Sequence, residues 1–443
     1  MEALEPWIER QYRHSAAAML RSVSPITLVK TRAGFGQTIV ARAGAIVASP
    51  VLAAYDPEPD YFFHWYRDSA VVVDALRLLA EDEDAGIDTR TFFADFVRFS
   101  AALGELDGRA LVQAPEWRAQ VAGDHLKYLR TDADLGSVHG ESVAAETRVN
   151  PDGTLDVSSW ARPQFDGPAL RALALLRWIR SPCLAGAPPA PVEALLRADL
   201  AVTFKHWRDA CFDIWEEEKG LHYYTLRVCA AALEGGADWL DLRGGSPQAE
   251  CYRSDAQAIL RQLDGYWLAD EHYYRSRILE SGRRSAKDLD IAVILAAIHA
   301  PADAATHSVH DPRMHATLAR LEKLFGELYP INHHRDPSHA PAMGRYAGDV
   351  YFSGGAYFFS TFGAAEFCYC AAKGAQNAAG LFERGDAFLR TARAYTPASG
   401  DLAEQFDQRT GEPRSARHLA WSYAAFISCI AARRRAQEVD LWT

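Results

Sequence analysis

Two stretches that lie far apart in the chain each place carboxylates beside bulky aromatic residues. The first is Phe212-Asp213-Ile214-Trp215-Glu216-Glu217 and the second is Ala403-Glu404-Gln405-Phe406-Asp407. An acid beside an indole loses part of its hydration, which raises its pKa and lets it hold a proton near neutral pH. A second carboxylate in a more polar setting stays ionised and can act as a base. Two such carboxylates on opposite sides of a sugar ring are what glycoside hydrolysis requires.

Three further segments combine aromatic rings with Arg and Asp. They are residues 61–68, 159–168 and 344–351. Aromatic rings offer sugars a flat apolar face, and an Arg-Asp pair offers fixed donors and acceptors for neighbouring hydroxyls. The structural alternatives are a core hairpin with a buried ion pair for the first segment and a helix cap at Asp166 with a packed Trp for the second. For the third, the alternative is a turn with a surface ion pair. The recurrence of these residue types favours a site for a neutral polyol.

Composition narrows the class of partner. The chain has 443 residues, 49% hydrophobic residues and a net charge of −11, which indicates a globular protein. The negative charge disfavours nucleic acid and anionic membranes as partners. We expect no signal peptide at the start and no membrane span, because neither a basic apolar leader nor a long apolar run is present. The sequence does not indicate an oligomeric state.

Cysteine and histidine usage gives no support for a metal or another cofactor. The seven cysteines are an odd number without paired metal-type spacing. His333, His334 and His339 form a loose group without further ligand spacing, so we interpret them as part of a solvated loop. Free thiols without a secretion signal predict a cytoplasmic location.

Hydrophobic periodicity predicts an all-α chain, and strand-like alternation is scarce. The predicted helices cover residues 69–81, 166–180, 191–211, 247–264, 285–300, 311–328, 354–374, 377–395 and 418–435. Loops rich in Gly, Pro and Asp separate several of them. Ten or more helices without a linker suggest one domain of stacked helical hairpins over residues 1–443, and periodicity alone leaves open whether they close into a ring.

Seven motifs occur in order along residues 44–426. They are GAIVASP at 44–50, YFFHWYRDS at 61–69, ETRVN at 146–150, WARPQFDGPALR at 160–171, FDIWEE at 212–217, GRYAGDVY at 344–351, and the closing segment 404–423 with TGE, SAR and WSY. This series resembles that of the glucoamylases, glycoside hydrolase family 15. The resemblance implies an (α/α)6 barrel, in which an outer ring of helices surrounds an inner ring of six. It also implies hydrolysis with inversion at the anomeric carbon.

The same resemblance implies roles for individual residues. Glu216 would be the general acid and Glu404 the general base. Arg67 and Asp68 would hold the terminal glucose, which makes the enzyme exo-acting. The remaining expected substrate-binding residues are Tyr61, Trp65, Trp160, Trp215, Glu217, Arg345, Asp349, Tyr351 and Trp421.

Several positions depart from the family pattern. Phe165 replaces Arg, Glu218-Lys219 replaces Val-Asn, His64 replaces Thr, and Gly355-Ala356-Tyr357 stands where Asn-Pro-Trp is common. We expect most of these changes to lie where the second sugar binds. The motif limits leave no room for the N-terminal β-sandwich or the C-terminal starch-binding domain that some relatives carry, so we expect a catalytic domain alone.

The sequence therefore predicts an inverting exo-α-glucosidase that releases β-glucose from the non-reducing ends of short α-gluco-oligosaccharides. Both maltose-type α-1,4 and isomaltose-type α-1,6 linkages are candidates, with a slight preference for α-1,6 because the second-sugar site is altered. One alternative is a glucosyltransferase or a trehalase-like hydrolase on the same scaffold. The other is a non-catalytic sugar sensor, which the presence of both Glu216 and Glu404 disfavours.

Overall fold

Six helices that are buried over most of their surface pack side by side in a closed ring. The computed structural model describes residues 3–54, 58–82, 86–184, 186, 188–302 and 306–440. The inner helices are α2 (Tyr66–Glu81), α6 (Asp166–Arg180), α8 (Tyr223–Asp241), α10 (Ala292–His299), α13 (Phe358–Ala372) and α15 (Ala420–Asp440). Each contacts the next in this order, and α15 contacts α2, which closes the ring. A helix that is apolar on nearly all sides, as α13 is, must be buried in this way.

Six amphipathic helices surround the inner ring. They are α1 (Leu4–Leu20), α3 (Arg90–Leu103), α7 (Ala190–His206), α9 (Pro247–Asp264), α11 (Pro312–Leu328) and α14 (Ala378–Tyr395). Five of them directly follow an inner helix in the chain, and α1 completes the set by packing on α15. Gly236 of α8 permits one close approach, because a Cβ atom at this position would lie 2.7 Å from Leu200 of α7. The predicted (α/α)6 barrel is therefore confirmed.

Four of the predicted helix boundaries were wrong by four residues or more. One is the end predicted at residue 435, because α15 continues to Asp440. The helix predicted over 191–211 ends at His206, and Cys211 and Phe212 form a strand instead. The helix predicted over 285–300 begins only at Ala292, and the one predicted over 354–374 begins at Phe358. In both cases the preceding residues belong to loops whose polar groups bind other loops. The prediction also missed α1, α3 and α8.

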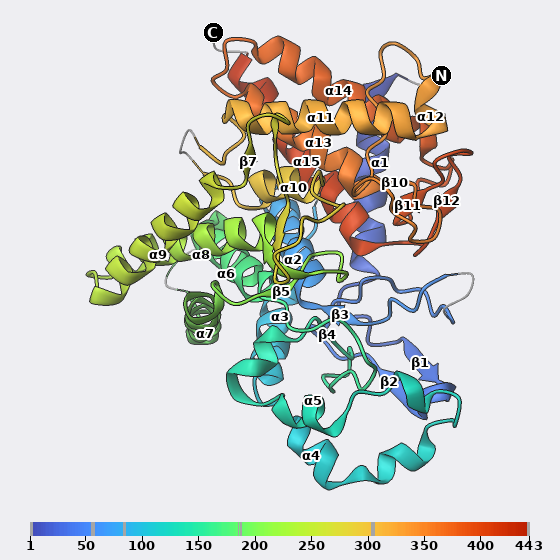
Figure 1. Cartoon of the computed structure of the whole chain (residues 1–443), viewed down its shortest axis with the longest axis vertical. Helices are drawn as coiled ribbons and strands as arrows, with labels where there is room; N and C mark the ends of the chain where they lie inside the picture. Colours follow the sequence, from blue (N-terminus) through green and yellow to red (C-terminus); the bar gives the residue numbers. More distant parts are fainter. Residues whose placement is uncertain are drawn as a thin grey trace.

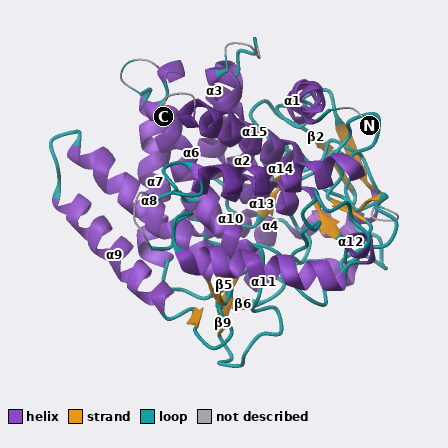
Figure 2. Cartoon of the chain, turned by 90° about the horizontal axis from the view of Figure 1, so that it is seen from above, coloured by secondary structure: helices purple, strands orange, loops and turns teal. Residues whose placement is uncertain are grey.

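Short strands and helical turns occupy the loops (Figure 2). The strands are β1 (Val29–Arg32), β2 (Gln37–Val40), β3 (His64–Trp65), β4 (Arg148–Val149), β5 (Cys211–Phe212), β6 (Lys219–His222), β7 (Trp267–Leu268), β8 (Tyr273–Tyr274), β9 (Arg277–Leu279), β10 (Ala356–Tyr357), β11 (Gln405–Phe406) and β12 (Pro413–Arg414). They pair antiparallel as β1-β2, β3-β4, β5-β6-β9, β7-β8 and β10-β11-β12. Short α-helices are α4 (Gly108–Gln113), α5 (Asp132–Ser137) and α12 (Pro330–His333), and 3-10 turns cover 33–35, 115–120, 126–128, 140–145 and 182–184.

The two ends of the barrel differ in the length of their loops. We call the end at which the inner helices begin the front end, and the end at which they finish the rear end. Segments 21–65, 104–165, 207–222, 265–291, 329–357 and 396–419 lead into inner helices at the front end. The connections at the rear end, such as residues 242–246 and 373–377, are much shorter. Chemistry that needs irregular backbone is therefore concentrated at the front end.

Residues 21–54, 58–65 and 104–165 pack together as a lobe that carries α4, α5, β1 and β2 on one side of the barrel (Figure 1). Two small apolar clusters hold it, one around Phe99 and Val149 and the other around Ile39 and Phe62. The main core is a single cluster that runs through all inner helices. Within the described residues, no helix combines the length and apolar character needed to cross a bilayer.

Candidate active site

The front end brings all the predicted site residues together. Three of them lie in the first two long loops: Tyr61 and Trp65 in segment 21–65 and Trp160 in segment 104–165. Segment 207–222 carries Trp215, Glu216 and Glu217, segment 329–357 carries Arg345, Asp349 and Tyr351, and segment 396–419 carries Glu404. The first turn of α2 carries Arg67 and Asp68, and the first turn of α15 carries Trp421. Direct contacts link each of them to at least one other member of the set. Residues from five loops and two helix starts thus form one continuous cluster.

Glu216 is held in a fixed orientation by donors from two other loops and from the first turn of α2. Its Oε1 accepts hydrogen bonds of 2.8 Å each from Trp65 Nε1 and Arg67 Nη2, and Trp160 Nε1 donates to Oε2. Its backbone has a φ of +67°, in the left-handed region that non-glycine residues rarely adopt. Asp213 supports this turn, because its Oδ1 accepts the backbone N–H groups of Glu217 and Glu218 at 2.8 and 2.9 Å. A strained backbone held by such support is common at functional sites.

Arg67 is the central cation of the cluster and is only 4% exposed. Its Nη2 binds Glu216, and its Nη1 contacts Asp166 at 3.1 Å and Gln164 at 3.2 Å. The neighbouring Asp68 is 6% exposed, and burial raises the pKa of its carboxyl to about 7 despite the nearby guanidinium. A buried Arg-Asp pair of this kind presents fixed donors and acceptors toward a ligand.

Glu404 contacts Tyr61 and Ser415. Its Oε2 accepts a hydrogen bond from Ser415 Oγ, and its Oε1 lies 3.4 Å from the Tyr61 hydroxyl. Tyr61 also shares a 2.7 Å hydrogen bond with the Tyr351 hydroxyl. The sequence predicted that this second carboxyl would lie in a more polar setting, and that was wrong: Glu404 is 8% exposed, and burial raises its pKa to about 7.

A second group of ionic contacts surrounds Glu217. Arg345 reaches its Oε1 at 3.3 Å and also makes a bidentate pair with Asp349, at 2.6 and 2.7 Å. Lys287 Nζ lies 2.6 Å from Glu217 Oε2, which also accepts from the Tyr346 hydroxyl. Glu217 is therefore fixed from two loops, with its carboxylate beside Arg345.

Three aromatic rings stack beneath this group. Phe359 and Trp421 have ring centroids 4.5 Å apart and planes 9° apart, and Trp215 stacks on both at 5.9 and 6.4 Å. The indole N–H of Trp215 donates to Asp290 at 2.9 Å, which fixes its ring plane. We call Trp215, Phe359 and Trp421 the aromatic layer.

Several contributors were missed at the sequence level. Ser415 binds Glu404, Lys287 binds Glu217, and Phe359 completes the aromatic layer. Arg148 lies over the rings of Trp65 and Trp160, with its guanidinium carbon 4.8 and 3.7 Å from their centroids. Arg148 and Ser415 both lie inside motifs already recognised, so motif membership was the signal that could have identified them.

Two of the departures from the family pattern point away from the cluster. His64 is fully buried and packs against Phe96 and Phe99; burial lowers its pKa to about 3. Phe165 stacks on His206 of α7, with centroids 5.0 Å apart. His64 and Phe165 therefore do not support the expectation that most of the departures lie where the second sugar binds.

The other departures from the family pattern differ in their distance from the cluster of predicted site residues. Glu218 binds Arg277 at 3.0 Å and Ser285 at 2.7 Å, and Lys219 pairs with Glu280 at 3.3 Å. Tyr357 does reach the cluster, since its hydroxyl donates to Asp349 at 3.1 Å. Across the described ranges, no three His, Cys, Asp or Glu residues are grouped in a way that would hold a metal ion.

Comparison with known proteins places this geometry in a family. A family model described as Glycosyl hydrolases family 15 matches residues 138–384 and 374–431. Glucoamylase 1 of Rhizopus oryzae is 26% identical over 96% of this chain and 70% of its own length. The intracellular sporulation-specific glucoamylase of Saccharomyces cerevisiae is 24% identical over 96% of this chain and 83% of its own length.

Solved structures agree with the family match. The glucoamylase of Hypocrea jecorina superimposes with a TM-score of 0.77 at 26% identity, over 98% of this chain and 73% of that one. The glucoamylase of Hormoconis resinae gives 0.76 at 26% identity, over 98% and 74%. The family model covers well over half of the chain, and the folds coincide over nearly all of it. The chain therefore belongs to glycosyl hydrolases family 15, a family of inverting glycoside hydrolases.

Proposed function

We propose that the protein is an inverting exo-acting α-glucosidase that releases β-glucose from the non-reducing ends of short α-gluco-oligosaccharides. One observation carries this proposal: two carboxyls flank a pair of touching rings. Trp65 donates to Glu216, the Tyr61 hydroxyl reaches Glu404, and the two ring centroids are 5.1 Å apart. A sugar seated on these rings would have a carboxyl on each side, as inversion needs.

In this proposal Glu216 protonates the glycosidic oxygen, and Glu404 removes a proton from the attacking water. Ser415 and Tyr61 orient the Glu404 carboxyl, and the raised pKa makes it a stronger base once it is ionised. The water attacks the anomeric carbon from the face opposite the leaving group, which yields β-glucose from an α-linked substrate. Asp213 and Arg277 act indirectly, since they hold the turn that presents Glu216.

Binding of the terminal glucose is assigned to Arg67 and Asp68, with Trp421 beside them. The Arg67 guanidinium lies 5.8 Å from the Trp421 ring, and both members of the charged pair are buried. Because they lie at the first turn of α2 and beside the aromatic layer, the substrate would reach them end-on. That arrangement supports removal of single glucose units from a chain end.

The second sugar is assigned to Trp160, which donates to Glu216, and to Glu217 and Arg345, which contact each other. Here Tyr357 stands where relatives commonly have Trp, and it contacts Asp349, the partner of Arg345. This substitution is the remaining support for a preference for α-1,6 over α-1,4 linkages. We propose that both linkages are cleaved, that the substrates are short and cytoplasmic, and that residues 1–443 act as one catalytic domain.

Initial rates of glucose release from maltose, isomaltose, maltoheptaose and trehalose test this proposal. We expect maltose and isomaltose to be cleaved, with maltoheptaose no faster than either and trehalose inert. The matched control is Glu404→Gln, which should abolish release from every substrate. Cleavage of trehalose alone would move the function to a trehalase, and glucosyl transfer to maltose without free glucose would move it to a transferase.

A further inference from the structure

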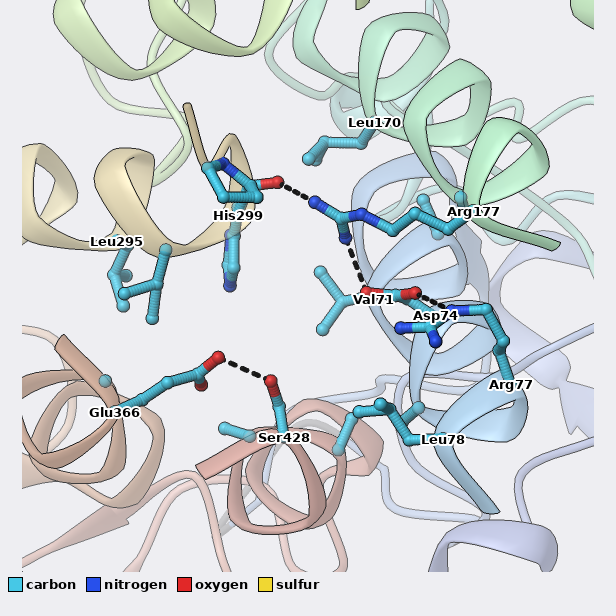
Figure 3. Close-up of a pocket in the computed structure, with 18 of the residues that line it drawn as sticks. Val71, Asp74, Arg77, Leu78, Leu170, Arg177, Leu295, His299, Glu366 and Ser428 are labelled. Carbon is cyan, nitrogen blue, oxygen red and sulfur yellow. Dashed lines mark hydrogen bonds and ion pairs between the residues drawn. The ribbon is translucent and has the colours of Figure 1, made fainter. Parts of the chain in front are cut away.

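A cavity of about 410 Å³ lies inside the barrel (Figure 3). Phe359 and Trp421 of the aromatic layer line one part of it, and the rest extends toward the rear end. Five of the six inner helices line it, namely α2, α6, α10, α13 and α15. Its lining runs from Ala70 to Glu81 along α2, which corresponds to a depth of about 16 Å at 1.5 Å per helical residue. Its volume falls in the usual range for small-ligand sites. None of the proposed catalytic steps uses this space.

The wall of the cavity changes character with depth. Near the aromatic layer the wall is mostly apolar, with Val71, Leu170 and Leu295 facing the cavity beside Phe359 and Trp421. His299 is a polar side chain in this part, with its ring centroid 6.1 Å from that of Trp421. Halfway along the helices further polar groups appear. Glu366 accepts a hydrogen bond from Ser428 at 2.6 Å, and Arg177 bridges Asp74 and the backbone carbonyl of His299 (Figure 3).

The outer end of the cavity is cationic. The lining of the cavity contains more arginines than carboxyl groups. The arginines are Arg77, Arg177, Arg180 and Arg435, and the carboxyl groups belong to Asp74, Glu81 and Glu366. Arg77 and Arg177 are already paired with these carboxyls. Arg180 and Arg435 are exposed, and neither has a salt-bridge partner within the part of the chain that the structure describes. In a chain with a net charge of −11, two unpaired cations at one mouth are a local exception.

We propose that the rear cavity binds a small organic monocarboxylate with an apolar body. The body would occupy the apolar inner part, and the carboxylate would bind Arg180 and Arg435 at the mouth. An uncharged sugar fits less well, because the inner wall is mostly aliphatic and aromatic, with His299 and the indole N–H of Trp421 as polar groups for its many hydroxyls. Inorganic phosphate alone would leave that inner part unfilled. This binding does not depend on the proposed glucosidase activity.

Isothermal titration of the full chain with octanoate, kept below its micelle concentration, tests the proposal. We expect saturable binding of one octanoate per chain. We also expect 1-octanol, which has the same body without the charge, to bind at least tenfold more weakly, and phosphate to show no saturable binding. Saturating glucose should not displace octanoate, because the sugar would bind at the front end.

Variants locate the site. Arg180→Gln with Arg435→Gln should weaken octanoate binding by tenfold or more, whereas Arg261→Gln, an exposed arginine on outer helix α9, should leave it unchanged. Val71→Phe should fill the inner part of the cavity and abolish octanoate binding. If the Val71→Phe protein does not fold, the arginine variants still test the proposal, because Arg180 and Arg435 lie at the exposed mouth. The proposal is overturned by absence of binding at millimolar octanoate, by equal binding of octanol, by displacement with glucose, or by equal effects of the three arginine changes.

Discussion

The front and rear ends of the barrel arrange their charged side chains differently. At the front end, Arg67 contacts residues from three segments, and Glu216, Glu217 and Glu404 each have a partner on another loop. At the rear end, Arg77 pairs with Asp74 and Glu81 on its own helix, and Arg177 of α6 pairs with Asp74 of α2. At the front end, long loops bring together residues that are far apart in the sequence, whereas at the rear end such residues meet through the packing of whole helices.

This contrast shows where the fold can tolerate strain. The left-handed backbone of Glu216 is supported by Asp213, which in turn pairs with Arg277 at 2.9 Å. Such a chain of support requires two or more loops, so it occurs only where loops are long. The rear cavity is formed instead by regular helices, and its shape is set by side-chain size.

The largest effect should come from the two carboxyls themselves. We expect Glu216→Gln or Glu404→Gln to lower kcat by about 10³-fold on maltose, because general acid or base catalysis is lost. Glu322→Gln, on outer helix α11, is the matched carboxyl-to-amide control and should keep its rate. Steady-state kinetics at pH 6.5 measure this, and a Glu216→Gln enzyme with near-normal kcat would refute the assignment.

Arg67 and Arg171 are both buried arginines paired with carboxylates. Comparing a substitution at each position therefore distinguishes a loss of catalysis from a loss of stability. Arg67→Met removes the donor to Glu216, so we expect a loss of about 10²-fold in kcat/KM through misplacement of the acid. Arg171→Met breaks a bidentate pair with Asp199 and should destabilise the fold by about 3–5 kcal/mol.

Thermal unfolding and kinetics on the two variants distinguish these effects. Both should lower Tm, but kcat/KM of the Arg171→Met enzyme, measured well below its Tm, should stay within about threefold of the parent. If both variants lost kcat/KM equally, Arg67 would be only a structural residue.

The smallest effect concerns pH. Burial raises the pKa of Glu404 and of Asp68 to about 7, so a base that must be ionised becomes protonated as the pH falls through that value. We expect kcat/KM to decrease below about pH 7, well above the ordinary carboxyl value of 4.5. Asp68→Asn removes a neighbouring negative charge and should shift this limb to lower pH. A limb that stays below pH 5 in the parent enzyme would contradict the role of Glu404.

Much of this architecture was predictable from sequence, and the failures have physical causes. The motifs identified every residue of the predicted cluster, and apolar periodicity predicted most helices. Ring closure required the contact between α15 and α2, which no local pattern encodes. His64 and Phe165 were misjudged because neighbours in a loop can point in opposite directions, and only packing against Phe99 and His206 determines theirs. The rear cavity arises from five helices at once and has no sequence signature.

A proton-NMR time course of maltose hydrolysis tests the central claim most directly, because it reports which anomer of glucose forms before mutarotation. With Glu216 as acid and Glu404 as base, water attacks from the face opposite the leaving group, and β-glucose must appear first. Isomaltose run in parallel shows which linkage is cleaved faster. α-Glucose appearing first would mean a retaining mechanism and would contradict the roles given to both residues.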